Sequence, residues 1–160
     1  MGRGGAGLAA RPGVRVTVGA PPASPPATAA TVLDVNGASA TPLDVTATNS
    51  GNTPPASTGT TATTTQAGEI AIGDIGWNSN VTPSAQTAGY TTTAVQQSTV
   101  SGSAAGEQAA FQVLSSTGAQ SYSATLSTST VAWTGAIATF KVSTGPPPVP
   151  TISSFNPTRG

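Results

Sequence analysis

Short runs in which apolar side chains recur at every second position dominate the chain between about residues 60 and 142. The clearest runs are EQAAFQVL at 107–114 and SYSATLS at 121–127. A period of two is the pattern of a β-strand that packs one face on a core. Sequences rich in Gly, Ser and Asn separate the runs, and no segment shows a capped helical period. The pattern predicts an all-β protein, an antiparallel β-sandwich of jelly-roll or immunoglobulin-like type.

Two runs depart from simple alternation. The run EIAIGDIGW at 69–77 contains four large apolar residues whose parity changes midway, and a β-bulge at Gly73 would bring all four onto the core side. The run VAWTGAIATFKV at 131–142 has apolar or small residues on both parities, which is typical of a strand covered on both sides. Tyr122 and Trp133 stand at core parity, so we expect both rings to be buried.

The N-terminal part of the chain has a different composition. Residues 1–30 are rich in Arg and Gly and then in Pro and Ala, which predicts a disordered region. The triplet Leu-Asp-Val occurs at 33–35 and again at 43–45, with Asn36-Gly37 between the two copies. Because Asn-Gly readily forms a type I′ turn, we expect these segments to pair as a hairpin.

One complete domain is predicted. The β-sandwich is expected over residues 31–144, with its best support over 60–142, and a Pro-rich linker follows at 145–150. The last stretch, TISSFNPTRG at 151–160, reads as one strand and one turn. A lone strand cannot bury its apolar face, so we expect the chain to be a fragment of a longer protein.

Charge is scarce and one-sided. Charged residues make up 6% of the chain, against roughly 25% in typical soluble domains, so Ser, Thr, Asn and Gln must supply the polar surface. Between residues 16 and 140 every charged side chain is acidic, which argues against nucleic acid as a partner. No apolar run reaches the roughly 20 residues needed for membrane insertion. The composition favours an extracellular or cell-surface location, without the apolar core of a clear signal peptide.

Catalytic chemistry has few groups to draw on. The chain contains no Cys and no His, which excludes disulfides, thiolate nucleophiles and His-based triads. A glycosidase needs two facing carboxylates. Without a bulge, Glu69 and Asp74 lie on opposite faces of one strand, and Glu107 opens a strand and is expected to face water. We therefore predict that the protein is not an enzyme.

Two kinds of ligand site remain open. We expect no cofactor, with calcium as the alternative, because calcium needs only oxygen ligands. The candidate calcium ligands are Asp74, Asn78, Asn80 and Glu107. A polysaccharide would bind exposed aromatic rings. The candidate sugar-binding rings, which border predicted turns, are Trp77 and Tyr90.

The segment AGEIAIGDIGWNSNVTPSAQTAGYTTTAVQQS, together with AAFQVL and the closing AWTGAIATFK, resembles a known family. That family is a β-sandwich module that recurs in secreted and surface-attached bacterial proteins. The resemblance covers about residues 60–142 and implies a non-catalytic accessory module. It transfers a structural class and no active residues.

A second resemblance covers about residues 149–160. Pro150, Ile152, Pro157 and Gly160 match the opening of an immunoglobulin-like IPT/TIG domain. Such modules are usually arranged in tandem on bacterial surface proteins, and only the first strand is present here. The resemblance implies that a neighbouring β-sandwich domain follows.

Three functions are compatible with these patterns. The first is a structural or adhesive module of a larger exported bacterial protein, whose partners are neighbouring domains or other copies. The second is a carbohydrate-binding accessory module. The third is a self-assembling subunit, in which the strand at Thr151–Phe155 or the N-terminal segment is added to the sheet edge of another copy. We favour the first.

Overall fold

The computed structural model describes residues 27–100 and 102–144. Every strand pair in this part of the chain is antiparallel, and none of its residues is helical. The all-β fold is therefore confirmed. The strands are β1 (Ala38–Gly51), β2 (Ala56–Ser57), β3 (Ile70–Trp77), β4 (Pro83–Ser84), β5 (Thr91–Thr92), β6 (Gln96–Val100), β7 (Ser103–Val113), β8 (Ser123–Leu126) and β9 (Trp133–Val142).

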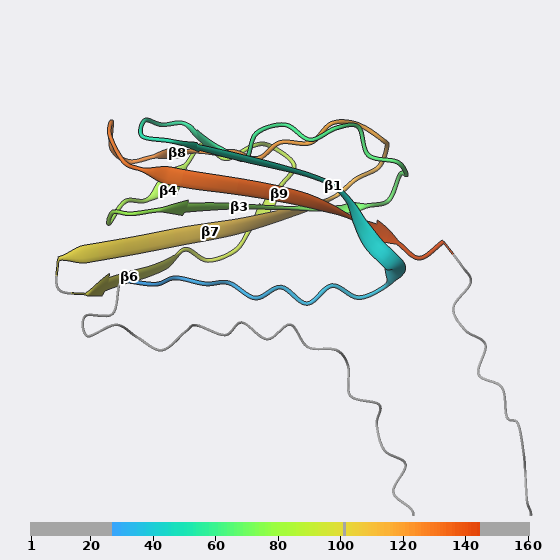
Figure 1. Ribbon diagram of the computed structural model, residues 1–160, viewed down its shortest axis with the longest axis horizontal. Coiled ribbons are helices and arrows are strands. Elements are labelled where there is room, and N and C mark those ends of the chain that lie inside the picture. The colour runs from blue at the N-terminus through green and yellow to red at the C-terminus, as the bar shows by residue number, and fades with distance from the viewer. Residues whose placement is uncertain (1–26, 101, 145–160) are drawn as a thin grey trace, which may run out of the picture.

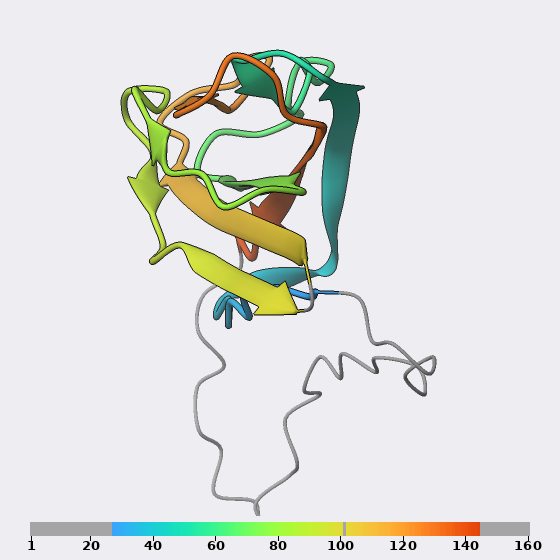
Figure 2. The same cartoon turned by 90° about the vertical axis from the view of Figure 1, so that its left-hand side faces the viewer.

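The strands form two sheets that face each other (Figures 1 and 2). The larger sheet has the order β1-β9-β3-β7-β5, with β6 also paired to β7, and the smaller has the order β2-β8-β4. Their facing sides supply one core, which combines Ala124 and Leu126 of β8 with Ile75 of β3 and Ile137 of β9. We call the opposite side of the larger sheet its outer face. The described residues contain no helix long and apolar enough to cross a membrane.

Strand β3 is regular, so the predicted bulge at Gly73 is wrong. Its register with β7 continues without a shift from Ile70 opposite Val113 to Trp77 opposite Gly106. The residues on its core side are Ala71, Gly73, Ile75 and Trp77, and those on its outer face are Ile70, Ile72, Asp74 and Gly76. Gly73 has a packing role instead, because a Cβ there would lie 2.8 Å from the Cβ of Tyr122.

The two aromatic residues expected in the core are there. Tyr122 is fully buried and Trp133 is 7% exposed. Strand β9 lies between β1 and β3, yet it is covered on both sides only in its second half. On its outer face Thr134 and Ala136 are exposed, while Ala138 is half-buried.

The segment before β1 follows the larger sheet instead of forming a hairpin. Residues 27–36, which we call the N-terminal arm, run along the sheet beside β6 and β7 (Figure 1) and form no strand. Gly37 has the expected positive φ of 80°, and its carbonyl accepts a hydrogen bond from the Ser143 amide. The Asn36-Gly37 turn therefore leads the arm back along the sheet, and the predicted hairpin is wrong.

Several predicted features fall outside the described residues. They are most of the N-terminal region expected to be disordered, the Pro-rich linker at 145–150, and the strand expected at 151–160.

The packing of Gly73 against Tyr122 can be tested with a matched pair of substitutions on β3. We expect Gly73→Ala to lower the free energy of unfolding by about 1–3 kcal/mol, because the new methyl group overpacks the core. Gly76→Ala is the control, since its Cβ would meet no atom closer than 3.7 Å. Urea denaturation measures both variants, and equal stabilities would contradict the close packing at Gly73.

Candidate functional site

The outer face of the larger sheet carries a pair of adjacent carboxyl groups. Asp74 lies on β3 and Glu107 on the neighbouring strand β7, where Glu107 is opposite Gly76 and Asp74 is opposite Ala109. The two side chains are therefore diagonal neighbours, and they share a hydrogen bond.

The N-terminal arm covers this pair. Glu107 is only 7% exposed, and its Oε1 accepts a hydrogen bond from the hydroxyl of Thr31 in the arm. Ala109, also on the outer face, is 5% exposed. The expectation that Glu107 faces water is wrong, because β7 begins at Ser103 and the arm lies over its middle.

A groove runs between the arm and the sheet. Its volume is about 760 Å³, and residues of the arm, β3, β7 and β9 line it. The arm side is built from small or apolar side chains, including Ala29 and Leu33, and the sheet side contains both carboxyl groups and Asn78. The groove is thus mainly apolar, with one acidic position.

Burial and mutual repulsion change the protonation of the pair. Desolvation, the hydrogen bond with Glu107 and the negative charge of Glu107 together raise the pKa of Asp74 from 3.8 to about 7. Its Oδ1 is buried without a hydrogen-bond partner. The pair therefore retains a proton near neutral pH, and this proton allows one carboxyl group to donate to the other.

The structure brings together some of the candidate calcium ligands. Asp74, Asn78 and Glu107 all line the groove, whereas Asn80 is exposed beyond the end of β3 and does not. Within residues 27–100 and 102–144, no three Asp, Glu, His or Cys residues are grouped closely enough to hold a metal ion. Calcium binding remains a prediction that these contacts do not test.

Neither candidate sugar-binding ring lies open on the surface. Trp77 is 4% exposed, and its indole packs against Gly106. Tyr90 is half-buried against the core, with its ring centroid 5.2 Å from that of Tyr122. The indole Nε1 of Trp77 and the hydroxyl of Tyr90 are both buried without hydrogen-bond partners. The two rings belong to the core and do not form a flat exposed platform.

The third acid, Glu69, is separated from the carboxyl pair by the sheet. It is fully buried and precedes β3 at core parity, so it lies on the opposite side from Asp74, as expected for a strand without a bulge. Its Oε1 accepts a hydrogen bond of 3.2 Å from the amide of Gln66. Glu69 and Asp74 therefore do not face each other across a common cleft.

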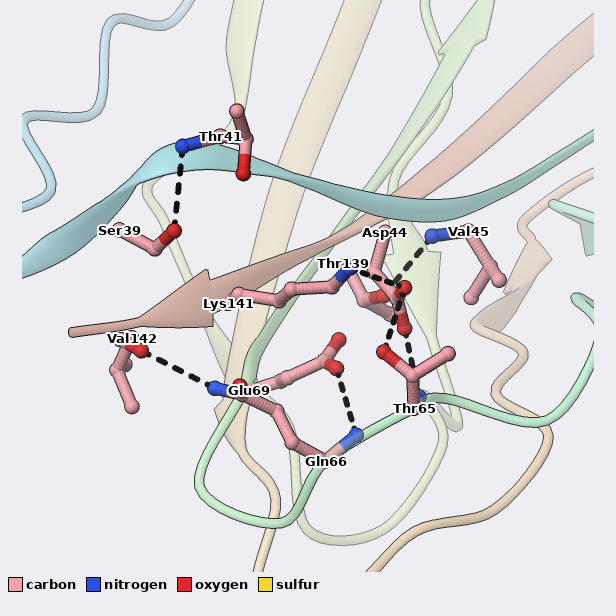
Figure 3. A network of polar contacts seen from close by, with 10 residues as sticks. All are labelled: Ser39, Thr41, Asp44, Val45, Thr65, Gln66, Glu69, Thr139, Lys141 and Val142. Atoms are coloured by element: carbon pink, nitrogen blue, oxygen red, sulfur yellow. Dashed lines mark hydrogen bonds and ion pairs between the residues drawn. The ribbon is translucent and has the colours of Figure 1, made fainter. Parts of the chain in front are cut away.

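A polar network that the sequence did not indicate joins β1, β9 and the loop before β3 (Figure 3). Lys141 Nζ lies 3.0 Å from Asp44 Oδ1. The amide of Thr65 donates to Asp44 Oδ2 at 2.7 Å, and its hydroxyl donates to Asp44 Oδ1 at 2.8 Å. Gln66 continues the network by donating from Nε2 to the carbonyl of Val142. These contacts fasten the loop to both strands.

The same network favours the ionised form of Asp44. Desolvation acts to raise its pKa, but hydrogen bonds from the Thr65 amide, from Lys141 and from the Thr65 hydroxyl outweigh it and hold the pKa at about 2. The stabilisation from this carboxylate is complete above the unfolded value of 3.8 and is lost as the pH falls towards 2.

Comparisons with known protein families, curated proteins and solved structures found no match for this chain. The resemblances of residues 60–142 and 149–160 therefore stay predictions.

The raised pKa of Asp74 has a measurable consequence for stability. Because the folded protein binds this proton more tightly than the unfolded chain does, the stabilisation is complete below about pH 4 and is lost as the pH rises through about 7. We expect Asp74→Asn to abolish this fall, since the amide can donate to Glu107 at any pH. The free energy of unfolding, measured from pH 4 to 8, checks the expectation.

The control for this measurement is Asp44→Asn, which should lower the stability but keep the wild-type slope above about pH 5, because a carboxyl group with a pKa of about 2 in the folded protein and 3.8 in the unfolded chain is ionised there in both states. Parallel curves for Asp74→Asn and the wild type would show that the pair holds no extra proton.

The surroundings of Trp77 and of the Tyr90 hydroxyl predict different effects on stability when each is removed. We expect Trp77→Ala to lower the free energy of unfolding by about 3–5 kcal/mol, because it empties a core position. Tyr90→Phe should leave it within about 0.5 kcal/mol, since the hydroxyl that it removes has no partner. Urea denaturation distinguishes these cases, and an unchanged stability of Trp77→Ala would place that ring outside the core.

Proposed function

We propose that this chain is a structural module, a non-catalytic β-sandwich spacer within a larger exported bacterial protein. The observation that carries the proposal is the position of the two ends of the described chain. The arm begins beside the end of β6, and the chain leaves after β9 at the other end of the sandwich (Figure 1). A module with ends on opposite sides extends a chain in line and separates its neighbours.

The arm makes this in-line geometry. At the start of β1, Ala38 is opposite Val142 of β9, so without the arm the chain would enter and leave at the same end of the sandwich. The docked arm carries the entry point back along the sheet, over a distance of at most roughly 33 Å for ten extended residues. A spacer of this kind depends on the contact between the arm and the outer face.

The contacts of the acidic residues and the composition of the chain agree with a structural role. Three of the acids have structural partners: Glu69 accepts a hydrogen bond from Gln66, Glu107 accepts one from Thr31, and Asp44 is paired with Lys141. The composition, with few charges and abundant Thr and Ser, favours a location outside the cell and supports export as part of the proposal. An adhesive role would add contacts with neighbouring domains or other copies.

The spacer proposal is tested on the intact protein with two spin labels. The labels are attached to cysteines introduced as Ala30→Cys and Ser143→Cys, both at exposed positions. They should be separated by roughly 25 Å, because eight extended residues join Ala30 to the start of β1, which lies beside the end of β9. Labels at Ala38 and Ser143 are the control and should interact at short range. Equal short distances in both pairs would contradict an in-line spacer.

A second measurement separates the spacer from a carbohydrate-binding module. We expect the purified protein to pass unretained over insoluble polysaccharides such as cellulose and chitin. Specific retention that soluble oligosaccharide reverses would contradict the spacer role. Because Trp77 is buried, the binding residues would then have to be sought elsewhere on the surface.

A further inference from the structure

The arm has the side-chain pattern of a strand, although it forms no ladder with the sheet. From residue 27 to residue 36, half-buried and exposed residues alternate without a break. The residues that face the sheet are Ala27, Ala29, Thr31, Leu33 and Val35. The side chains at every second position and the hydrogen bond from Thr31 to Glu107 therefore contribute to holding the arm on the sheet.

The outer face is shaped to receive such a segment. Ile72, Asp74 and Gly76 of β3, together with Glu107 and Ala109 of the adjacent strand β7, line the sheet side of the groove. A volume of about 760 Å³ remains open along the arm, so the two surfaces do not interlock tightly. The face thus accepts an extended segment with small or β-branched side chains at alternate positions, and such a segment can leave without disturbing the ladders.

The connection between the arm and β1 is suited to opening. Asn36 and Gly37 are both exposed. Gly37 has a φ of 80°, and no atom lies within 4 Å of the position where its Cβ would be. The positive φ is what turns the arm back onto its own sheet, because an extended residue at this position would direct the arm away from it.

We propose that the outer face accepts the arm of a second copy of this chain, so that two molecules exchange residues 27–35 through an opened Asn36-Gly37 turn. Each face would then hold the same side chains as before, supplied by the partner. The contacts are equal in the closed monomer and in the exchanged dimer. The effective concentration of the arm near its own sheet therefore sets the equilibrium between monomer and dimer, and this concentration is about 1 mM for a short connection. Exchange therefore occurs where copies are crowded, as at a surface.

Exchange goes beyond the spacer role, which needs only an arm docked on its own sheet. It gives two spacers a lateral connection without creating any new interface. If exchange fails, the in-line geometry of the single molecule is unaffected, so the two proposals can fail separately.

Cysteine pairing between two variants tests the exchange, because the natural chain has no cysteine. Thr31→Cys places a thiol on the arm, and Glu107→Cys places one on the face that contacts it. In an equimolar mixture of the two variants at about 1 mM, we expect the mixed disulfide dimer to exceed that of the control mixture about fivefold. The control mixture combines Thr31→Cys with Thr125→Cys, an exposed position on β8 in the other sheet.

If Glu107→Cys disturbs the fold, as judged by circular dichroism, Ala105→Cys replaces it, because Ala105 lines the same groove and leaves both carboxyl groups in place. A chain that carries both Thr31→Cys and Glu107→Cys should form its disulfide within one molecule at low concentration. Failure of that internal disulfide would show that the arm does not lie on the face.

The turn provides an independent test without cysteines. Gly37→Val disfavours the positive φ that the closed turn requires. Forming one dimer opens two such turns, so the effect counts twice. We expect the dimer dissociation constant in sedimentation equilibrium to fall roughly 100-fold, about tenfold per turn. Gly102→Val is the matched control, because Gly102 has a φ of 83° and an equally open Cβ position but lies in the turn between β6 and β7, outside the connection between the arm and β1.

The proposal is supported if the mixed disulfide exceeds its control and only Gly37→Val strengthens the dimer. It is overturned if the internal disulfide forms while the mixed disulfide stays at the control level, or if both glycine variants stay monomeric at about 1 mM.

Discussion

Coverage of the outer face of the larger sheet is the constraint on which the other features depend. Strands β3 and β9 are central, and their outward side chains include Ile70, Ile72 and Phe140 as well as the carboxyl group of Asp74. Apolar groups and a carboxyl pair on one sheet face are costly to leave in water and costly to bury unprotonated. The arm covers Ile72 and the carboxyl pair, and the proton that the pair retains lowers the cost of burying two acids together. The in-line chain path and the capacity for exchange both follow from the same contact.

Much of the fold could be predicted from residue patterns, because a strand with one buried face has apolar residues at every second position of its own sequence. Strand β8 and the core positions of Tyr122 and Trp133 are examples. The predicted bulge at Gly73 is wrong because the glycine makes room for the side chain of Tyr122, which lies about 50 residues further along the chain. Local parity cannot show such a contact.

The candidate site was only partly predictable. Asp74 and Glu107 were singled out by residue type, but their adjacency depends on the register of β3 with β7, which no single segment contains. Lys141 and Asp44 meet for the same reason, across β1 and β9. The turn beside Trp77 predicts an accessible ring, whereas the packing of that ring against Gly106 depends on the neighbouring strand β7.

The packing of the arm on the sheet was not predicted, because the composition of the arm does not indicate it. Its outward positions include Ala30 and Val32, so no polar and apolar alternation distinguishes the side that faces the sheet. A stretch of Ala, Thr and Pro normally indicates a linker, and only the tertiary structure shows that the final part of it packs. What was expected to be an inert connection is the element that most affects the proposed function.

The most direct test of this account is the position of the arm in dilute solution. A nitroxide attached at Val32→Cys, a side chain that is 67% exposed in the arm, broadens the amide signals of nearby residues in NMR spectra. The account predicts broadening along β7 and the adjoining part of β3, with the signals of Ser123–Leu126 in the other sheet unaffected. Signals of β7 as sharp as those of β8 would contradict it, because the arm would then not cover the outer face.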